Sequence, residues 1–516
     1  MRINKLSVLF GSLLLVSAGA FFVWGVNHLH SPGLVFLFVL ATLFGLFMAF
    51  NIGGNDVANS FGTSVGSGTL SLRQALIVAA IFEVSGAVIA GGKVTETIRK
   101  GIVDMDMLEK FQGFDPMGLV YLMMAALLAA GVWILLATKF GMPVSTTHSM
   151  VGGIVGSAIA LAAVEMGSDS ALKLVQWHKM GTIAISWVVS PVLGGAVAFT
   201  LFWIVRRTVL RYNDGAEQQL LNLHSRLQMR QQFKAHERLA EIQRQAFAEG
   251  SPVVVPAKRK PSKKSVEADE PREEKQLRLE GKSHRALEVH VPIIAGLGAL
   301  VMTSMILFKG LKHLHLPLMA WHKALIVAVV SLVAWKAISM LAKSLRGKTL
   351  SRSTLLLFNW MQVFTASGFA FSHGSNDISN AVGPFAAVFD VLRNGTIQNT
   401  PVPMIAMVAF GIALCAGLWF VGKEVIQTVG TSLTEIHPAS GFSAELSAAT
   451  VVMLATVLGI PVSSTHILVG AVLGIGLVNR STNWRIMRPI ALAWVVTLPA
   501  SAIMSAIVFL VLRSVF

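Results

Sequence analysis

The most constraining feature of this chain is a series of apolar runs, each long enough to cross a lipid bilayer. A membrane-spanning helix needs about 20 consecutive apolar residues. We place such runs at 7–26, 34–51, 73–92, 117–138, 179–205, 291–308, 317–343, 354–372, 402–421 and 486–512. Two others, 143–164 and 446–478, contain prolines and polar clusters and are interpreted as broken or re-entrant. The pattern predicts an all-α polytopic integral membrane protein with about 10–12 transmembrane segments.

Composition excludes several other classes of protein. Charged residues make up 13% of the chain and the mean hydropathy is +0.67, whereas a soluble globular chain is about 25% charged. A soluble enzyme is therefore disfavoured. The single cysteine, Cys415, excludes an intrachain disulfide framework and a metal cluster built on cysteines.

Charge is concentrated in residues 206–290, which contain 18 Lys or Arg and 12 Asp or Glu residues. We expect a polar helix over about 214–249 and disorder in the second half. Basic loops favour the cytoplasmic side of a membrane. The loop lacks the regular interleaving of aromatic and basic residues that a base-stacking platform needs, so we expect no nucleic-acid partner.

The chain contains an internal repeat. GGNDVANSFG at 53–62 matches GSNDISNAVG at 374–383, PVSTTHSMVG at 143–152 matches PVSSTHILVG at 461–470, and WVVS at 187–190 matches WVVT at 494–497. We therefore expect an extra helix in 1–33, repeats at 34–205 and 354–516, the charged loop 206–290 and a helix pair in 291–353. Repeats of opposite topology permit alternating access. We therefore predict that the fold consists of two inverted-topology repeats with broken or re-entrant helices.

The first repeated motif supplies oxygen ligands at membrane depth. Its polar residues are Asn55, Asp56, Asn59, Asn376, Asp377 and Asn380. The adjacent glycines are expected to break each helix and expose carbonyl groups. Carboxylate, amide and carbonyl oxygens suit a hard cation such as Na⁺, although the carboxylates could carry protons instead. Helix capping is the alternative reading, and the duplication favours a functional role.

The second repeated motif has the signature of a helix N-terminus. Its hydroxyl-bearing residues are Ser145, Thr146, Thr147, Ser463, Ser464 and Thr465, and each set follows a Pro-Val pair. Unpaired N–H groups and the helix dipole make such an end an anion site. Hydroxyl packing between helices is the alternative. For the next residues, His148 and His466, a structural and a proton-carrying role remain equally open.

Other ionisable residues interrupt apolar sequence. Glu83 and Glu445 are candidates for coupling or gating, although they do not occupy equivalent positions in the two repeats. His373 has no counterpart, because Ile52 occupies the equivalent position, and it is given no place in the site.

At these motifs the sequence resembles the inorganic phosphate transporter (PiT) family. The resemblance is carried by residues 53–75, 82–102, 143–153, 372–387 and 461–474 and covers most of the chain outside 1–33 and 206–290. It implies an inverted-repeat carrier that moves phosphate with a cation. By this resemblance, phosphate would be surrounded by Asp56, Ser145, Thr146, Thr147, Asp377, Ser463, Ser464 and Thr465. The coupling ion would be bound by Asn55, Asn59, Asn376 and Asn380, and the two glutamates match acidic positions of the sodium-coupled members.

Electrostatics gives this expectation a mechanism. A phosphate dianion beside Asp56 and Asp377 is repelled unless positive charge binds with it. We therefore expect a phosphate symporter in the plasma membrane, or the inner membrane if the protein is bacterial. Its partners would be inorganic phosphate, Na⁺ or H⁺ and the lipid bilayer, without a cofactor, and a homodimer is one oligomeric state to consider. An H⁺-coupled or metal-phosphate symporter and a sulfate permease are the main alternatives. A membrane enzyme using Ser145 or Ser463 and a channel rank far below a carrier.

Overall fold

The computed structural model describes residues 5–111, 115–213, 270–308, 318–396, 402–428 and 436–516, with residues 215, 218, 225, 229, 232, 235–238, 241 and 244. Within these residues, the side chains at 59, 270–283, 308, 424, 427 and 486 are not described. The polar helix expected over 214–249 falls largely outside the described residues.

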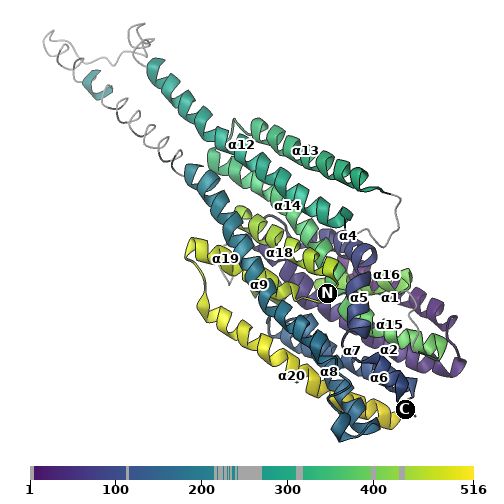
Figure 1. Cartoon of the computed structure of the whole chain (residues 1–516). Helices are drawn as coiled ribbons and strands as arrows, with labels where there is room; N and C mark the ends of the chain where they lie inside the picture. Colours follow the sequence, from purple (N-terminus) through teal and green to yellow (C-terminus); the bar gives the residue numbers. More distant parts are fainter. Residues whose placement is uncertain are drawn as a thin grey trace. The chain divides into compact units, whose positions relative to one another are not determined.

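The described residues are almost entirely helical (Figure 1). In chain order the helices are α1 Lys5–Val26, α2 Val35–Ile52, the π-helix η2 Gly53–Val57, α3 Ala58–Gly66, α4 Leu72–Ala90, α5 Gly92–Lys100, α6 Met105–Lys110, α7 Pro116–Lys139, α8 Thr146–Glu165, α9 Trp177–Val205, the π-helix η4 Arg206–Leu210, α12 Glu270–Phe308, α13 Ala320–Ser344, α14 Leu350–Asp377, α15 Ser379–Asn394, α16 Met404–Val421, α17 Lys423–Gln427, α18 Pro438–Leu458, α19 Ser464–Asn479 and α20 Trp484–Val515. Short 3₁₀ turns lie at Pro32–Leu34 and Ser168–Ser170. Among these described residues, 12 helical segments are long and apolar enough to cross a membrane, which confirms the predicted all-α, multi-pass class.

The chain divides into two compact units. The larger unit contains Met1–Trp203, Leu297–Ser331 and Phe358–Phe516, and the smaller contains Ile204–Gly296 and Leu332–Leu357. Within the smaller unit, the Asn213 amide donates a hydrogen bond to Thr354 Oγ1 at 2.8 Å, and Arg346 forms an ion pair with Glu288. Every candidate site residue lies in the larger unit, so the site is described within that unit alone.

The chain is helical through both asparagine–aspartate motifs, although the glycines were expected to break it. The winding widens to a π-helix at Gly53–Val57 in the first half and changes at one residue, Ile378, in the second. The glycines instead permit close packing: a methyl group on Gly53 would lie 1.7 Å from the carbonyl oxygen of Leu414. On Gly374 it would lie 2.2 Å from the carbonyl oxygen of Glu83. Thus α2 packs on α16 and α14 packs on α4, each across the two halves.

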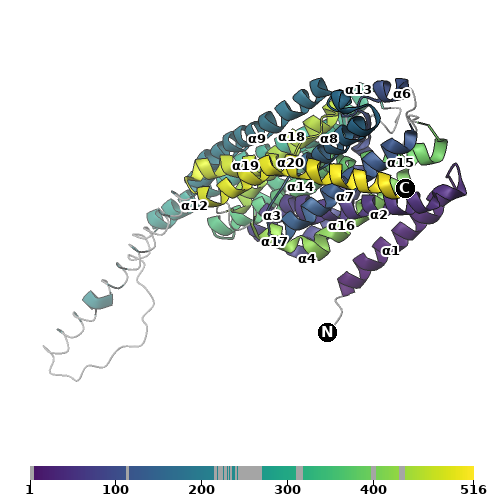
Figure 2. The same cartoon turned by 90° about the horizontal axis from the view of Figure 1, so that it is seen from below.

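The helices that follow the Pro-Val motifs also pack across the halves. A methyl group on Gly156 of α8 would lie 2.0 Å from the carbonyl oxygen of Ala502 in α20. On Gly474 of α19 it would lie 2.3 Å from that of Gly195 in α9. Both views of the larger unit place α20 along α8 (Figures 1 and 2). The duplication in the sequence therefore extends to these backbone contacts.

One expectation for the charged loop was wrong. Residues 270–290 were expected to be disordered, but α12 begins at Glu270 and continues into the apolar run that ends at Phe308. This stretch is rich in Glu, Lys, Arg and Leu, which are good helix formers. Pro271 lies in the first turn, where a missing N–H is tolerated. The boundary placed at residue 290 therefore falls inside a helix.

Candidate functional site

Both hydroxyl-bearing motifs form helix N-termini, as predicted from the sequence. Ser145 is the N-cap of α8, and its hydroxyl accepts a hydrogen bond from the backbone N–H of His148 at 3.1 Å. Ser463 is the N-cap of α19 and accepts from the N–H of His466 at 3.2 Å. We call residues 145–147 and 463–465 the two tips.

An asparagine of each first motif holds the tip of its own half. The Asn55 amide donates to Thr138 Oγ1 at 3.0 Å, and its oxygen accepts from the Val144 N–H at 3.1 Å. In the second half, Asn376 accepts from the N–H of Val462 at 3.4 Å. These amides are thus bonded to the segments that lead into α8 and α19, one residue before each N-cap serine.

The two tips and the two repeated aspartates meet in one buried cluster. Thr146 Oγ1 and Thr465 Oγ1 each donate to a carboxylate oxygen of Asp56, both at 2.5 Å. Ser464 donates to Asp377. All five side chains are at most 2% exposed. Because Thr465 reaches the aspartate of the other half, the structure brings both tips and both carboxylates together.

Further contacts join the halves beside this cluster. The amide of Asn380 donates to Thr147 Oγ1 at 3.1 Å, and that hydroxyl donates to the carbonyl oxygen of Val462 at 2.9 Å. Asn380 thereby contacts the tip of the opposite half. The side chain of its counterpart, Asn59, lies outside the described part of the structure.

His373, which the sequence analysis left out, lies between two carboxylates. Its Nδ1 is hydrogen-bonded to Glu83 Oε2 at 2.8 Å. Its Nε2 is 2.8 Å from Asp377 Oδ2, an ion-pair distance without hydrogen-bond geometry. The spacing of four residues between His373 and Asp377 places both on one face of α14. This spacing was the signal in the sequence from which the contact between the two residues could have been predicted. Glu83, in contrast, is 290 residues away in sequence.

The central cluster also satisfies the distance requirement of a metal site. One ligand atom from each of Asp56, His373 and Asp377 lies within 4.8 Å of the others, and all three residues are buried. Carboxylate and hydroxyl oxygens suit hard cations, whereas the imidazole nitrogen is better suited to transition metals. The oxygen-rich side facing the tips is therefore the part of this cluster that fits Na⁺.

Glu445 lies in a separate buried cluster of hydroxyl and amide donors. Its oxygens accept from Thr63 at 2.7 Å, Ser64 at 2.5 Å, Gln362 at 3.0 Å and Thr365 at 2.9 Å. Thr365 precedes Asp377 by 12 residues, which is about 18 Å along a helix. The structure therefore does not bring Glu445 into the cluster that holds Glu83.

The comparisons with known proteins agree on one family. The model of the phosphate transporter family matches residues 52–505. A Mycobacterium bovis protein named "Putative phosphate permease" is 54% identical over 516 residues, covering 98% of this chain and 93% of that protein. The chloroplastic inorganic phosphate transporter 2-1 of Arabidopsis thaliana is 35% identical, with coverages of 90% and 70%.

A solved structure shows the same fold. It is titled "The sodium-dependent phosphate transporter", has a TM-score of 0.71 and 31% sequence identity, and covers 93% of this chain and all of that chain. This likeness accounts for the helical architecture, and the family match spans both tips and both aspartate motifs. The chain belongs to the phosphate transporter family and is a multi-pass membrane protein.

Proposed function

We propose that this protein is a symporter that moves inorganic phosphate together with a cation, with Na⁺ favoured, by alternating access of two inverted halves. The observation that carries the proposal is the hydrogen bond of 2.5 Å from Thr465 to Asp56. It joins a tip of one half to the carboxylate of the other, at the centre of a buried cluster. The name of the structural neighbour supports sodium as the coupling ion.

The tips supply donors suited to a tetrahedral oxyanion. The N-terminal turns of α8 and α19 offer backbone N–H groups and a partial positive charge. The hydroxyls of Thr146, Ser464 and Thr465 donate to carboxylates in this structure. On phosphate binding they would donate to phosphate oxygens, while Ser145, Thr147 and Ser463 complete the ring of hydroxyls. A site of neutral donors can release its ligand, as a carrier must.

The aspartates make binding of the anion depend on a cation. A dianion near Asp56 and Asp377 is repelled strongly in a buried environment, so Na⁺ must bind with it. Amide oxygens of Asn55, Asn59, Asn376 and Asn380 are the proposed additional ligands, and Glu83 and Glu445 are proposed to couple ion binding to the conformational change.

The same carboxylates provide selectivity. Both protonation states of phosphate present near neutral pH carry an O–H that an aspartate can accept. Sulfate carries none and would meet only repulsion, which discriminates by penalising the wrong ligand. A sulfate permease of this architecture is the alternative that competition by unlabelled sulfate would reveal.

Proton coupling is the second candidate, and the position of His373 favours it. The imidazole of His373 is a fully buried ionisable group between Glu83 and Asp377, so a proton could replace the sodium ion. In this alternative a metal-phosphate complex could be the transported species.

The test is phosphate uptake into proteoliposomes with Na⁺ and pH gradients imposed separately. Uptake driven by Na⁺ alone supports the proposal, and uptake driven only by a proton gradient selects the alternative. We expect Asp56→Asn to abolish coupled uptake or relax the preference for phosphate over sulfate. Glu96→Gln, at an exposed position, should leave uptake unchanged. Normal Na⁺-dependent uptake by both Asp56→Asn and Asp377→Asn would refute the mechanism.

We also propose the topology of the two halves, the location of the charged loop and the oligomeric state. Inverted topology would follow if labelling placed equivalent loops of the two halves on opposite sides of the membrane. The charged part of 206–290 that lies between the candidate spans Trp177–Asn213 and His284–Leu307 is proposed to lie on the cytoplasmic side of the plasma membrane, because of its basic residues. A homodimer would be recognised by the mass of the detergent-solubilised protein.

A further inference from the structure

The short helix α5 contacts the segment that leads into the second tip. We call this segment, residues 457–462, the second lead-in; it runs from the last turn of α18 to the residue before the N-cap of α19. The ammonium group of Lys93 donates to the carbonyl oxygen of Val457 at 3.2 Å, and the hydroxyl of Thr97 donates to that of Gly459 at 2.7 Å. These contacts cross from the first half to the second, and the proposed transport mechanism does not use them.

The two donors bind backbone groups at the end of a helix. The last carbonyl groups of a helix lack intrahelical partners, and a cationic side chain is favoured at a helix C-terminus. Gly459 ends α18 in the left-handed conformation, with φ 71°. Farther along, the carbonyl oxygen of Ile460 accepts from Asn376 at 3.4 Å. That of Val462 accepts from Thr147 at 2.9 Å. Helix α5 therefore holds the second lead-in together with residues of the site itself.

The opposite face of α5 is anchored on α15. At about 100° per residue, Lys93 and Thr97 share one face of α5, and Arg99 lies on the other. Arg99 pairs with Asp390 of α15 at 2.5 Å, and both side chains are at most 8% exposed. Helix α15 begins at the second residue after Asp377. Thus α5 connects the helix that follows one aspartate of the site to the lead-in of the second tip.

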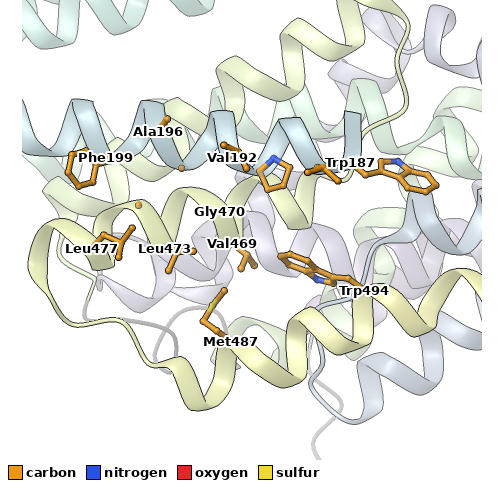
Figure 3. Close-up of a pocket in the computed structure, with 14 residues that line it drawn as sticks. Trp187, Val192, Ala196, Phe199, Val469, Gly470, Leu473, Leu477, Met487 and Trp494 are labelled. Atoms are coloured by element: carbon orange, nitrogen blue, oxygen red, sulfur yellow. The ribbon is translucent and has the colours of Figure 1, made fainter. Parts of the chain in front are cut away.

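The second tip depends on its lead-in because α19 is not fully enclosed by other helices. A cavity of about 570 Å³ lies between α9, α19 and α20 (Figure 3), and Val469, Leu473 and Leu477 of α19 line it. By contrast, α8 packs along both α7 and α20. The cavity reduces the protein contact on one face of α19, so the contacts of the second lead-in matter more for where this tip lies.

We propose that α5 positions the second tip for phosphate, with Lys93 and Thr97 as its positioning residues. Arg99 holds α5 on α15, and the two donors hold the second lead-in at a fixed place relative to Asp377. Neither donor needs to touch the anion. The inference rests on the proposed function, in which the second tip binds phosphate.

The test is phosphate uptake into proteoliposomes by Lys93→Met and Thr97→Val. Both substitutions keep the approximate shape of the side chain and remove the donor. Each should raise KM for phosphate about threefold to tenfold, the effect of one lost hydrogen bond. Because the tip is displaced and the reacting groups are unchanged, kcat should stay within about twofold of the wild-type value. Lys93→Arg keeps a cationic donor and should restore most of the wild-type KM.

Lys423→Met is the matched control. Lys423 follows Gly422 in the second half as Lys93 follows Gly92 in the first, and it is exposed. Its substitution should leave KM unchanged. A raised KM in Lys93→Met with a wild-type KM in Thr97→Val would show that the charge acts on phosphate directly, and would refute the positioning role. A wild-type KM in both variants would refute it as well.

Hydrogen exchange tests the same contacts without reference to transport. In the full chain in lipid nanodiscs, the backbone amides between residues 459 and 466 should exchange faster in Lys93→Met than in the wild type. Lys423→Met should not change them. If the wild-type protein moved no phosphate, the proposed function would fail, but the exchange rates would still decide whether α5 holds the second lead-in. Unchanged exchange in Lys93→Met would overturn the inference.

Discussion

The crossing of α8 and α20 makes a sharp prediction for Gly156→Ala. The added methyl carbon would lie 2.0 Å from the carbonyl oxygen of Ala502, whereas comfortable carbon–oxygen contacts are about 3.3 Å or longer. Both groups belong to backbone, so no side-chain rotation relieves the overlap. The helices must separate by roughly 1 Å, and overpacking of this kind costs about 1–3 kcal/mol.

Gly181→Ala is the matched control. Gly181 lies in α9, and a methyl group there would meet nothing within 4 Å. Alanine should stabilise this helix by about 0.5–1 kcal/mol because it restricts the unfolded chain and favours helix. The two substitutions are chemically identical, but their surroundings differ. We therefore expect Gly156→Ala to lower the free energy of unfolding and Gly181→Ala to raise it.

Thermal unfolding of the purified protein in detergent compares the stabilities of the two variants. Phosphate uptake then tests whether a shift of α8 also displaces the tip at its N-terminus. Thr146 begins the helix that contains Gly156, and a misplacement of about 1 Å can lower a rate about 100-fold. We therefore expect Gly156→Ala to lower both melting temperature and phosphate uptake. If it melted at or above the temperature of Gly181→Ala, the inferred tight crossing would be incorrect.

Two further predictions concern buried polar contacts. Asp390 pairs with Arg99 at 2.5 Å, with both side chains at most 8% exposed, so Asp390→Asn should lower the melting temperature by removing the carboxylate charge of a buried ion pair. Glu96→Gln, which breaks an exposed pair on the same helix, should change the melting temperature very little. Asn376→Ala should lower kcat/KM for phosphate about 10–100-fold by loosening its tip, equivalent to about 1–3 kcal/mol. Asn27→Ala removes an exposed amide that donates to the carbonyl oxygen of Val23 in the last turn of α1, and it should leave kcat/KM unchanged.

The tips were predictable because their information is local. Pro-Val followed by hydroxyl residues determines where a helix can begin, and Ser145 and Ser463 cap the helices at the expected positions. Duplication then indicated that both tips serve one site. The bonds from Thr465 and Thr146 to Asp56 agree with that inference.

The remaining contacts depend on helix packing that the sequence alone does not specify. Glu83 meets His373 because α4 crosses α14 at Gly374, and nothing in the local sequence of Glu83 indicates this partner. The glycines beside the aspartates were expected to break the helices because glycine is conformationally free. Their role in the structure is to let two helices approach each other closely, which the sequence alone does not show. Likewise, the donors around Glu445 come from segments about 80 and 380 residues away in sequence.

The two halves differ at the ionisable pair of His373 and Glu83, which lies beside Asp377. The repeat places Ile52 at the position of His373, and the matching glycine contact places Leu414 where Glu83 lies in the other half. These apolar residues in the first half show that the crossing itself requires no ionisable group. The ionisable pair in the second half is therefore better explained by function than by packing.

This comparison predicts the behaviour of the double variant His373→Ile, Glu83→Leu. His373→Ile leaves the buried carboxyl of Glu83 without its histidine partner and should cost about 3–5 kcal/mol. Glu83→Leu leaves His373 beside Asp377 and should cost less. The double variant reproduces the apolar residues of the other half and should be more stable than His373→Ile, because the unpaired carboxyl of Glu83 is removed as well. Uptake driven by a pH gradient should be lost in the double variant if this pair carries the proton. Loss of Na⁺-driven uptake as well would show that Glu83 couples Na⁺ binding to transport, as proposed above. A double variant as unstable as the sum of the singles would show that the two crossings are not interchangeable, and the charged pair would then have a structural role.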